Sequence, residues 1–181
     1  MTSNKHKFNE VAVIAEKLGI CLEMLPGKKI EIQSSSLMDI AFYSALENYK
    51  EFRKPILVED AGLFIEALNG FPGPYSSYVY KTIGVKGILK LMEGIENRRA
   101  YFSSAVVLIH EPYLIKCEER VYGYISNEPR GTGGFGFDPI FVPEGDTRTF
   151  AEMSIDEKNK YSHRAKAVSK AFNKLISLLK T

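Results

Sequence analysis

The sequence has little cysteine, no long apolar run and no excess of either charge. Two cysteines, Cys21 and Cys117, lie in apolar or alternating runs without a metal-type spacing, which indicates reduced thiols in a cytoplasmic protein. The apolar runs are far too short to span a membrane, and the amino terminus has no apolar export signal. These absences argue against a disulfide scaffold, a cysteine metal site and a membrane protein.

The near balance of charge limits the kinds of partner. Lys plus Arg total 24 against 22 for Asp plus Glu, a net charge of +2. This balance argues against a general nucleic-acid surface but permits a local basic site for phosphates. No G-x-x-x-x-G-K-[ST] run occurs, which argues against a GTPase-type switch. With 181 residues, 45% of them hydrophobic, the chain suits one globular domain or two lobes sharing a core.

The spacing of apolar residues predicts a mixed α/β protein. Helical spacing occurs in the segments 5–18, 36–49 and 85–92 and in the C-terminal stretch that follows Ser162. Patterns typical of strands occupy 20–25, 29–33, 55–62, 100–110, 113–124 and 140–142. The two longest of these flank Glu111-Pro112 and predict an antiparallel hairpin. A short turn capped by Ser154 is expected at 155–158.

The stretch Arg130–Pro139 packs four glycines around two phenylalanines and a carboxylate. Glycine permits φ > 0 and close backbone approach to a ligand, a ring offers a flat face, and an acid offers acceptors, all of which suit a nucleotide base. Gly131, Gly133 and Gly136 also match the dinucleotide fingerprint. That motif needs a helix directly afterwards, however, and Asp138-Pro139 is followed by a strand pattern, so a Rossmann site is rejected. The alternative is a glycine-rich hairpin loop.

Two acids stand at the end of the predicted strand 55–62. Ligand groups gather at the carboxyl ends of strands in α/β sheets, and successive side chains alternate in direction, so only one of Glu59 and Asp60 can face a site. The pattern favours a functional acid over a solvated pair. Glu31 and Gln33 share one face of the predicted strand 29–33.

Cations stand at the amino ends of two predicted helices. Lys5, His6 and Lys7 follow Thr2-Ser3-Asn4, and His163-Arg164 opens the last helix. Free backbone N–H groups beside cations form a natural seat for phosphate. The alternative is that Asn4 caps the first helix and the cations are solvated.

Assembled in order, these segments resemble the inosine triphosphate pyrophosphatase family, the Ham1-like hydrolases of non-standard purine nucleotides. The matching pieces run from end to end of the chain: Thr2-Ser3-Asn4-Lys5-His6-Lys7, Glu31-Ile32-Gln33, Val58-Glu59-Asp60-Ala61-Gly62, Gly70-Phe71-Pro72-Gly73-Pro74-Tyr75-Ser76, Gly134-Phe135-Gly136-Phe137-Asp138-Pro139 and Glu157-Lys158-Asn159-Lys160-Tyr161-Ser162-His163-Arg164. The resemblance implies an α/β fold with a mixed twisted sheet and flanking helices, in which two lobes of a single domain, residues 1–181, surround a central cleft. It also implies a homodimer.

The activity implied by the resemblance is hydrolysis of a nucleoside triphosphate between the α and β phosphates, giving monophosphate and pyrophosphate with Mg²⁺. Glu31 and Asp60 would hold the metal, and Asp60 is likened to the catalytic base. Carboxylates supply the hard oxygen ligands that Mg²⁺ prefers. The residues implied to bind substrate are Thr2, Ser3, Asn4, Lys5, His6, Lys7, Ala61, Phe135, Gly136, Phe137, Asp138, Lys158, His163 and Arg164.

The resemblance also implies the choice of base. Phe135 would stack on it, while Asp138, His163 and Arg164 would read its edge. Hypoxanthine and xanthine present a 6-keto acceptor to cationic or N–H donors. The amino group of adenine would leave those donors unpaired, at a cost of about 1–3 kcal/mol per buried group. Inosine, deoxyinosine and xanthosine triphosphates are therefore the implied substrates, in nucleotide-pool house-cleaning.

Two other functions stay open at this point. One is a Maf-like pyrophosphatase with a different base preference, and the other is a non-catalytic nucleotide-binding module that binds without turnover. No nucleic-acid or membrane partner is expected for any of the three.

The sequence departs from the family pattern in two places. The family usually carries a strand ahead of the Thr-Ser-Asn loop. Either the reading frame starts further upstream or this strand is missing, and restored upstream residues are expected to raise melting temperature and activity. In the helix after Glu31, Leu46 or a neighbour stands where the family often has a phosphate-binding lysine. Lys50, one turn beyond, is either its substitute or a surface charge.

Overall fold

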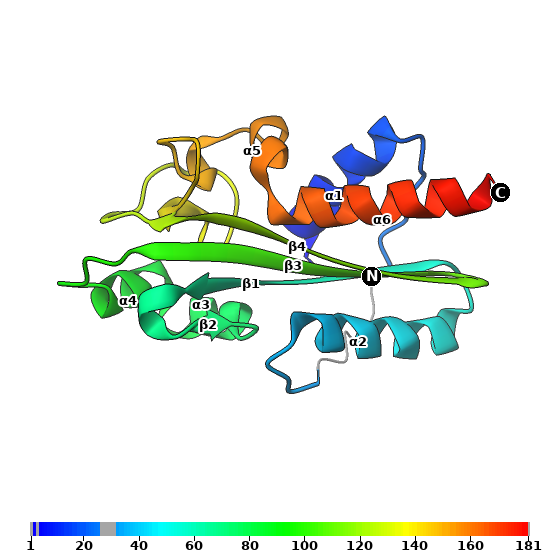
Figure 1. Cartoon of the computed structure of the whole chain (residues 1–181), viewed down its shortest axis with the longest axis horizontal. Helices are drawn as coiled ribbons and strands as arrows, with labels where there is room; N and C mark the ends of the chain where they lie inside the picture. The colour runs from blue at the N-terminus through cyan, green and yellow to red at the C-terminus, as the bar shows by residue number, and fades with distance from the viewer. Residues whose placement is uncertain (1, 3, 26–31, 181) are drawn as a thin grey trace. The chain divides into compact units, whose positions relative to one another are not determined.

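The structure, a computed structural model, describes residue 2 and residues 4–25 and 32–180 (Figure 1). Its helices are α1 Lys5–Lys17, α2 Leu37–Phe52, α3 Ser76–Thr82, α4 Gly84–Leu91, α5 Ile155–Tyr161 and α6 His163–Leu179, and its strands are β1 Ile56–Ile65, β2 Pro72–Gly73, β3 Arg99–His110, β4 Tyr113–Ile125 and β5 Phe141–Pro143. The chain divides into two compact units. Unit 1 comprises Met1–Asp60, Ser104–Glu119 and His163–Thr181, and unit 2 comprises Ala61–Ser103 and Arg120–Ser162.

The five strands form one sheet in the order β2-β1-β3-β4-β5. β1 pairs antiparallel with β2 through Leu63 opposite Gly73, and β4 pairs antiparallel with β5 through Tyr124 opposite Val142. The predicted hairpin is present as the neighbouring strands β3 and β4. Side chains of β4 alternate between buried and exposed, as expected for a strand with one face in the core. The mixed α/β class is therefore confirmed.

Unit 1 has helices on both faces of its part of the sheet. α1 and α6 pack together on one face, and α2 covers the other (Figure 1). The apolar stripes of α1 and α6 bury their side chains against β3 and β4, because residues three and four apart share a helix face. The buried members of this core are Val11, Ile14, Ala15, Val106, Leu108, Ile115, Cys117, Ala165, Ala167, Val168, Ala171, Phe172 and Leu175.

Unit 2 has a core rich in aromatic rings. Phe141 packs at 4.7 Å from Phe102 and 5.1 Å from Phe150, measured between ring centroids. The remaining buried members are Leu63, Ile65, Val79, Ile88, Met92, Ala100, Val121, Ile125, Phe137, Ile140 and Met153. At Gly62, a Cβ atom would lie 2.2 Å from the carbonyl oxygen of Gly73, so only glycine permits the close approach of β1 to β2.

Most predicted elements are present with small shifts at their ends. The helices expected at 5–18, 36–49 and 85–92 are α1, α2 and α4, and the C-terminal helix is α6. The turn expected at 155–158 continues as the helix α5. α3 was not predicted, because it has only seven residues and no side-chain cap marks its start.

The strand predicted at 20–25 is wrong, since these residues belong to no strand or helix. Their alternating pattern has a different cause: Ile20 and Leu22 pack against the unit 1 core without pairing in the sheet. A period of two reports burial on one face, whereas a strand also needs a hydrogen-bonded neighbour. The strand predicted at 29–33 lies largely outside the described residues, and Ile32 and Gln33 are not in a strand. Among the described residues, no helix has the length and apolar character to cross a membrane.

Candidate active site

Charged side chains that are distant in sequence form a buried cluster in unit 1. Glu59, near the middle of β1, stands at its centre with its side chain 5% exposed. Its Oε2 lies 2.9 Å from Lys7 Nζ, and its Oε1 lies 3.1 Å from Arg164 Nε. The hydroxyl of Ser104 on β3 donates to the same Oε1 at 2.8 Å. Arg164 NH1 also donates to Oε2 of Glu10. Glu10, Arg164, Glu59 and Lys7 are the acid–base cluster of unit 1.

The electrostatics of this cluster keep Glu59 ionised. Burial by itself raises the pKa of the carboxyl, but the charges of Arg164 and Lys7 and the hydrogen bonds from Lys7 and Ser104 lower it more. The net pKa of Glu59 lies well below its ordinary value of 4.5. Glu59 is therefore an anion that holds two cations in place, and it is a poor proton acceptor.

The structure confirms that Asn4 caps the first helix. Its Oδ1 accepts the backbone N–H groups of His6 at 2.9 Å and Lys7 at 3.3 Å, and the backbone N–H of Asn4 donates to Thr2 Oγ1 at 3.1 Å. The same alternative expected the cations at this helix end to be solvated. This expectation is wrong for Lys7, which pairs with Glu59. Lys5 and His6 are exposed. Ser3 lies outside the described residues.

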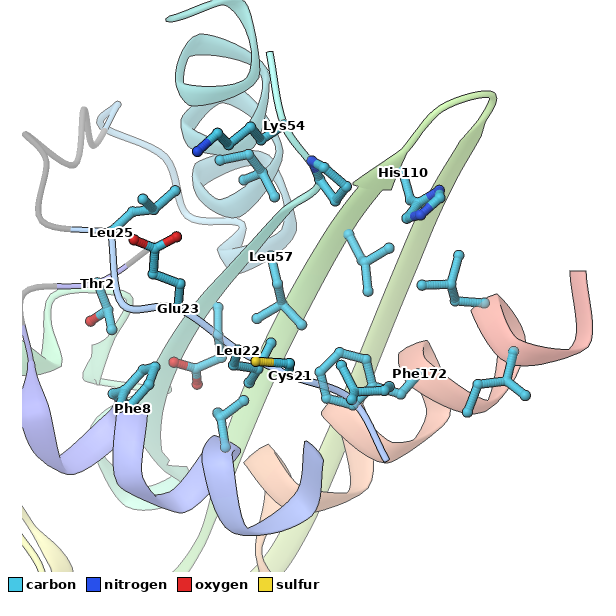
Figure 2. Close-up of a pocket in the computed structure, with 18 of the residues that line it drawn as sticks. Thr2, Phe8, Cys21, Leu22, Glu23, Leu25, Lys54, Leu57, His110 and Phe172 are labelled. Carbon is cyan, nitrogen blue, oxygen red and sulfur yellow. The ribbon is translucent and has the colours of Figure 1, made fainter. Parts of the chain in front are cut away.

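A cavity of about 520 Å³ lies in unit 1 (Figure 2). Lys7 and Glu59 of the acid–base cluster line it. Thr2, Lys7 and Glu59 contribute polar groups to its wall. Most of the wall is apolar and comes from α1, the segment 20–25, β1 and α6, as the positions of Phe8, Leu22 and Phe172 show (Figure 2). Lys7 is the most accessible of the three residues joined through Glu59, with 19% of its side chain exposed against 5% for Glu59 and 3% for Arg164.

Asp60 follows Glu59 directly on β1 and is also buried, at 8% exposure. Since side chains alternate along a strand, the carboxyl groups of Glu59 and Asp60 are directed to opposite faces. The acid that pairs with Lys7 is Glu59. Strand alternation alone left open which of the two acids would do so. Ala61 is partly buried and belongs to unit 2. Glu31 lies outside the described residues.

The donor set of this region suits Mg²⁺ only in company with substrate. Among the residues that the structure describes, no group of three or more His, Cys, Asp or Glu side chains is placed to hold a metal. Mg²⁺ commonly binds through one or two carboxylates, with waters and substrate phosphates completing its coordination. Asp60, a buried carboxylate with hard oxygen donors, fits that kind of site.

A second cluster, in unit 2, brings together three residues of the predicted substrate site. Asp138 Oδ2 accepts the Phe135 backbone N–H at 2.8 Å and a hydrogen bond from Lys158 Nζ at 2.6 Å. The same ammonium lies 5.1 Å from the centroid of the Phe135 ring, a cation–π distance. Lys158 and Asp138 are both 3% exposed, whereas Phe135 is only partly buried. These three residues are the base-side cluster of unit 2.

Local sequence explains how the base-side cluster is built. Gly134 has φ +66°, and a Cβ atom there would lie 2.2 Å from Asp138 Oδ2, so glycine alone permits the turn that brings Asp138 to Phe135. Lys158 is carried by α5, whose start is defined by a capping box between Ser154 and Glu157. A hydrogen bond from Arg148 is the main cause that lowers the pKa of Glu157 to about 2.

The remaining predicted residues lie in the unit 2 core, in a loop, at the start of α6 and at the surface. Phe137 packs in the unit 2 core, with its ring centroid 5.6 Å from that of Tyr80 in an edge-to-face contact. Gly136 has φ +64° in the loop between the two phenylalanines. His163 is 2% exposed at the first position of α6, beside Arg164. Lys50 is a surface charge: 64% of its side chain is exposed, and its Nζ pairs with Glu47 at 2.6 Å.

Sequence reasoning did not assign Glu10, Glu59 and Ser104 to the site. Glu59 carried a signal, because it belongs to the acidic pair on β1. Glu10 and Ser104 carried none, since their partners are distant in sequence: Glu10 and Arg164 stand 154 positions apart.

These observations define a mixed α/β protein with one buried cluster of acids and cations in unit 1 and a second cluster in unit 2 that joins an aspartate, a lysine and a phenylalanine. The Ham1 family profile matches residues 1–174. The chain belongs to the Ham1 family.

Three relatives that match almost the whole chain are named dITP/XTP pyrophosphatase. The one from Hyperthermus butylicus is 52% identical over 92% of this chain and 87% of its own length. The relative from Saccharolobus solfataricus is 53% identical over 94% and 88%, and that from Pyrococcus horikoshii is 49% identical over 99% and 97%. A solved structure of a HAM1 protein from Coxiella burnetii aligns with a TM-score of 0.83 and 30% identity, covering 97% of this chain and 96% of that one.

Proposed function

We propose that this protein hydrolyses non-standard purine nucleoside triphosphates, namely inosine, deoxyinosine and xanthosine triphosphates, to monophosphate and pyrophosphate. The names of relatives at about half identity support this class of substrate. The observation in the chain itself that carries the proposal is the base-side cluster, in which Asp138 holds the Lys158 ammonium beside the partly buried ring of Phe135. A flat face with a fixed cation and a fixed acid matches a keto-purine.

The proposed phosphate-binding part is the amino end of α1 with Lys7. Glu59 holds the Lys7 ammonium at 2.9 Å, so the cation is placed before a ligand arrives and little ordering is needed on binding. The proposed phosphate-binding part also includes the residues that precede Lys7, namely Thr2, Ser3, Asn4, Lys5 and His6. Cations placed in advance stabilise the negative charge that develops on a leaving pyrophosphate.

Asp60 is the proposed general base. Glu59 is unsuited to that role, because Lys7 and Arg164 lower its pKa and occupy its oxygens. Asp60 is the neighbouring buried carboxylate and would orient or deprotonate the attacking water. Glu31 and Asp60 would together hold Mg²⁺, which when bound supplies neutralisation of phosphate charge.

The proposed base-side residues are Phe135, Gly136, Phe137, Asp138, Lys158, His163 and Arg164. Phe135 would stack on the base, and polar groups at its edge would favour a 6-keto acceptor over the amino group of adenine. Ala61 completes the proposed set of substrate contacts.

The remaining features of the proposal concern organisation. We propose one catalytic domain formed by residues 1–181, a homodimer, and a cytoplasmic location in which the free thiols Cys21 and Cys117 stay reduced. No nucleic-acid or membrane partner is part of the proposal.

The decisive experiment measures pyrophosphate release from inosine and xanthosine triphosphates, compared with adenosine, guanosine and pyrimidine triphosphates, with and without Mg²⁺. We expect Mg²⁺-dependent release from the first two and, for the adenine nucleotide, rates roughly tenfold to hundredfold lower. Preferred cleavage of pyrimidine nucleotides would indicate a Maf-like preference instead. Binding of inosine triphosphate without any release would indicate a non-catalytic module.

Replacing Phe135 by alanine is expected to raise the Michaelis constant for inosine triphosphate by the equivalent of about 1–3 kcal/mol, because a stacking face is lost. Steady-state kinetics on the purified variant would measure this. Phe42→Ala is a matched control, since the Phe42 ring also lies under an ammonium, that of Lys116 at 3.4 Å, but belongs to no predicted substrate motif. Equal Michaelis constants for the Phe135 variant and the wild type would remove Phe135 from the site.

A further inference from the structure

Glu10 is a buried acid that belongs to none of the sequence motifs of the proposed site. It lies on α1, is 3% exposed, and accepts a hydrogen bond from Arg164 NH1 on α6. Arg164 is 3% exposed as well. Two charges removed from water in this way are tolerated only because they pair, and an apolar contact between α1 and α6 would have met the needs of packing alone.

The contacts of Arg164 form a chain of alternating charge. NH1 of the guanidinium faces Glu10, Nε faces Glu59 at 3.1 Å, and Glu59 in turn faces Lys7 at 2.9 Å. A guanidinium is planar and rigid, so two carboxylates on different nitrogens fix the orientation of its plane. The two cations and two carboxylates sum to zero charge.

Both ends of this chain come from one helix. Lys7 and Glu10 are three residues apart on α1 and therefore share a helix face. Glu59 on β1 and Arg164 on α6 complete the path between them. The position of the Lys7 ammonium thus depends on its contact with the Glu59 carboxylate. How strongly that carboxylate binds Lys7 depends in turn on its contact with Arg164, whose orientation Glu10 fixes.

We propose that Glu10 is a positioning residue that keeps Lys7 in place for phosphate binding, acting through Arg164 and Glu59. This inference rests on the proposed function in so far as Lys7 is taken to bind the phosphates of the substrate. Without the charge of Glu10, Arg164 turns more of its N–H groups toward Glu59 and competes with Lys7 for that carboxylate. Lys7 then loses its fixed position.

The first test is Glu10→Gln, which keeps the shape of the side chain and removes its charge. We expect the Michaelis constant for inosine triphosphate to rise about tenfold while kcat changes by less than about threefold, because ground-state phosphate binding is what weakens. Glu16→Gln is the matched control: it removes the same charge from an exposed position of α1 and is expected to behave as wild type. An unchanged Michaelis constant in Glu10→Gln would overturn the proposal.

A double-mutant cycle with Lys7→Met separates positioning from general support of the fold. If Glu10 acts through Lys7, Glu10→Gln raises the Michaelis constant less than about twofold in the Lys7→Met background, whereas it raises it about tenfold in the wild-type background. A merely structural role gives the same fold-change in both backgrounds, and this result would overturn the proposal. Glu10→Asp, which keeps the charge on a shorter side chain, serves in the same cycle if Glu10→Gln does not fold, with a smaller coupled effect expected.

The same cycle measured on binding of inorganic triphosphate by calorimetry needs no turnover. A wild-type protein that releases no pyrophosphate would overturn the proposed function, and the coupling in triphosphate affinity would still decide the role of Glu10. Positioning is supported if Glu10→Gln lowers the triphosphate affinity of the wild-type protein but leaves that of the Lys7→Met variant unchanged. Equal fold-changes in both backgrounds, or no triphosphate binding by the wild-type chain, would overturn it.

Discussion

Replacing Asp60 by asparagine is expected to lower pyrophosphate release from inosine triphosphate by at least about a hundredfold, because a positioned carboxylate that accepts a proton contributes about 10²–10⁴ to a rate. The amide cannot accept the proton of the attacking water and is a weaker Mg²⁺ ligand. The fold should be largely preserved, since the two side chains have nearly the same size. Single-turnover release of pyrophosphate and the melting temperature measure the two effects.

One control sharpens this expectation. Glu96→Gln removes a charge from an exposed loop acid and is expected to leave both quantities unchanged. Wild-type turnover in Asp60→Asn would show that Asp60 is not the general base, and release of single phosphate from the wild-type enzyme would show that a different bond is cleaved.

The second large effect is on stability. Replacing Glu59 by glutamine is expected to destabilise the protein by about 3–5 kcal/mol, because breaking a buried ion pair leaves an uncompensated charge. Glu59 faces Lys7 at 2.9 Å and Arg164 at 3.1 Å, so two cations and one carboxylate, Glu10 beside Arg164, would remain in the acid–base cluster. Urea unfolding followed by circular dichroism gives the free energy of unfolding.

A double variant provides the matched control for Glu59. Glu59→Gln with Lys7→Met removes one charge of each sign and restores a zero sum in the acid–base cluster. It is expected to recover part of the stability that Glu59→Gln loses, since partners in one network are not additive. If Glu59→Gln unfolds at the same urea concentration as the wild type, the cluster does not have the energetic role that its burial indicates.

The errors in the predicted fold have two physical origins. The segment 20–25 alternates as a strand does, but Ile20 and Leu22 only pack on the unit 1 core. The alternation of apolar residues shows which face of a segment is buried, whereas strand pairing depends on whether another strand lies beside it. α3 shows the converse: a short helix with neither a side-chain cap nor a long apolar stripe leaves no mark in the sequence.

The sequence by itself determined the elements whose signals are local. The cap at Asn4, the capping box of Ser154 and Glu157, and the glycines that permit close approach at Gly62 and Gly134 all act within a few residues or demand one residue type. The same locality explains why the base-side cluster was predicted in part: Phe135 and Asp138 are three positions apart, and a single turn joins them.

Only the tertiary structure decided the acid–base cluster. Strand alternation left open whether Glu59 or Asp60 meets the cations, and folding placed Lys7 from α1 and Arg164 from α6 around Glu59. The partnership of Glu10 with Arg164 joins residues 154 positions apart. Such pairs depend on how α1 and α6 pack on the sheet, and the cost of burying one charge alone makes each partner necessary to the other.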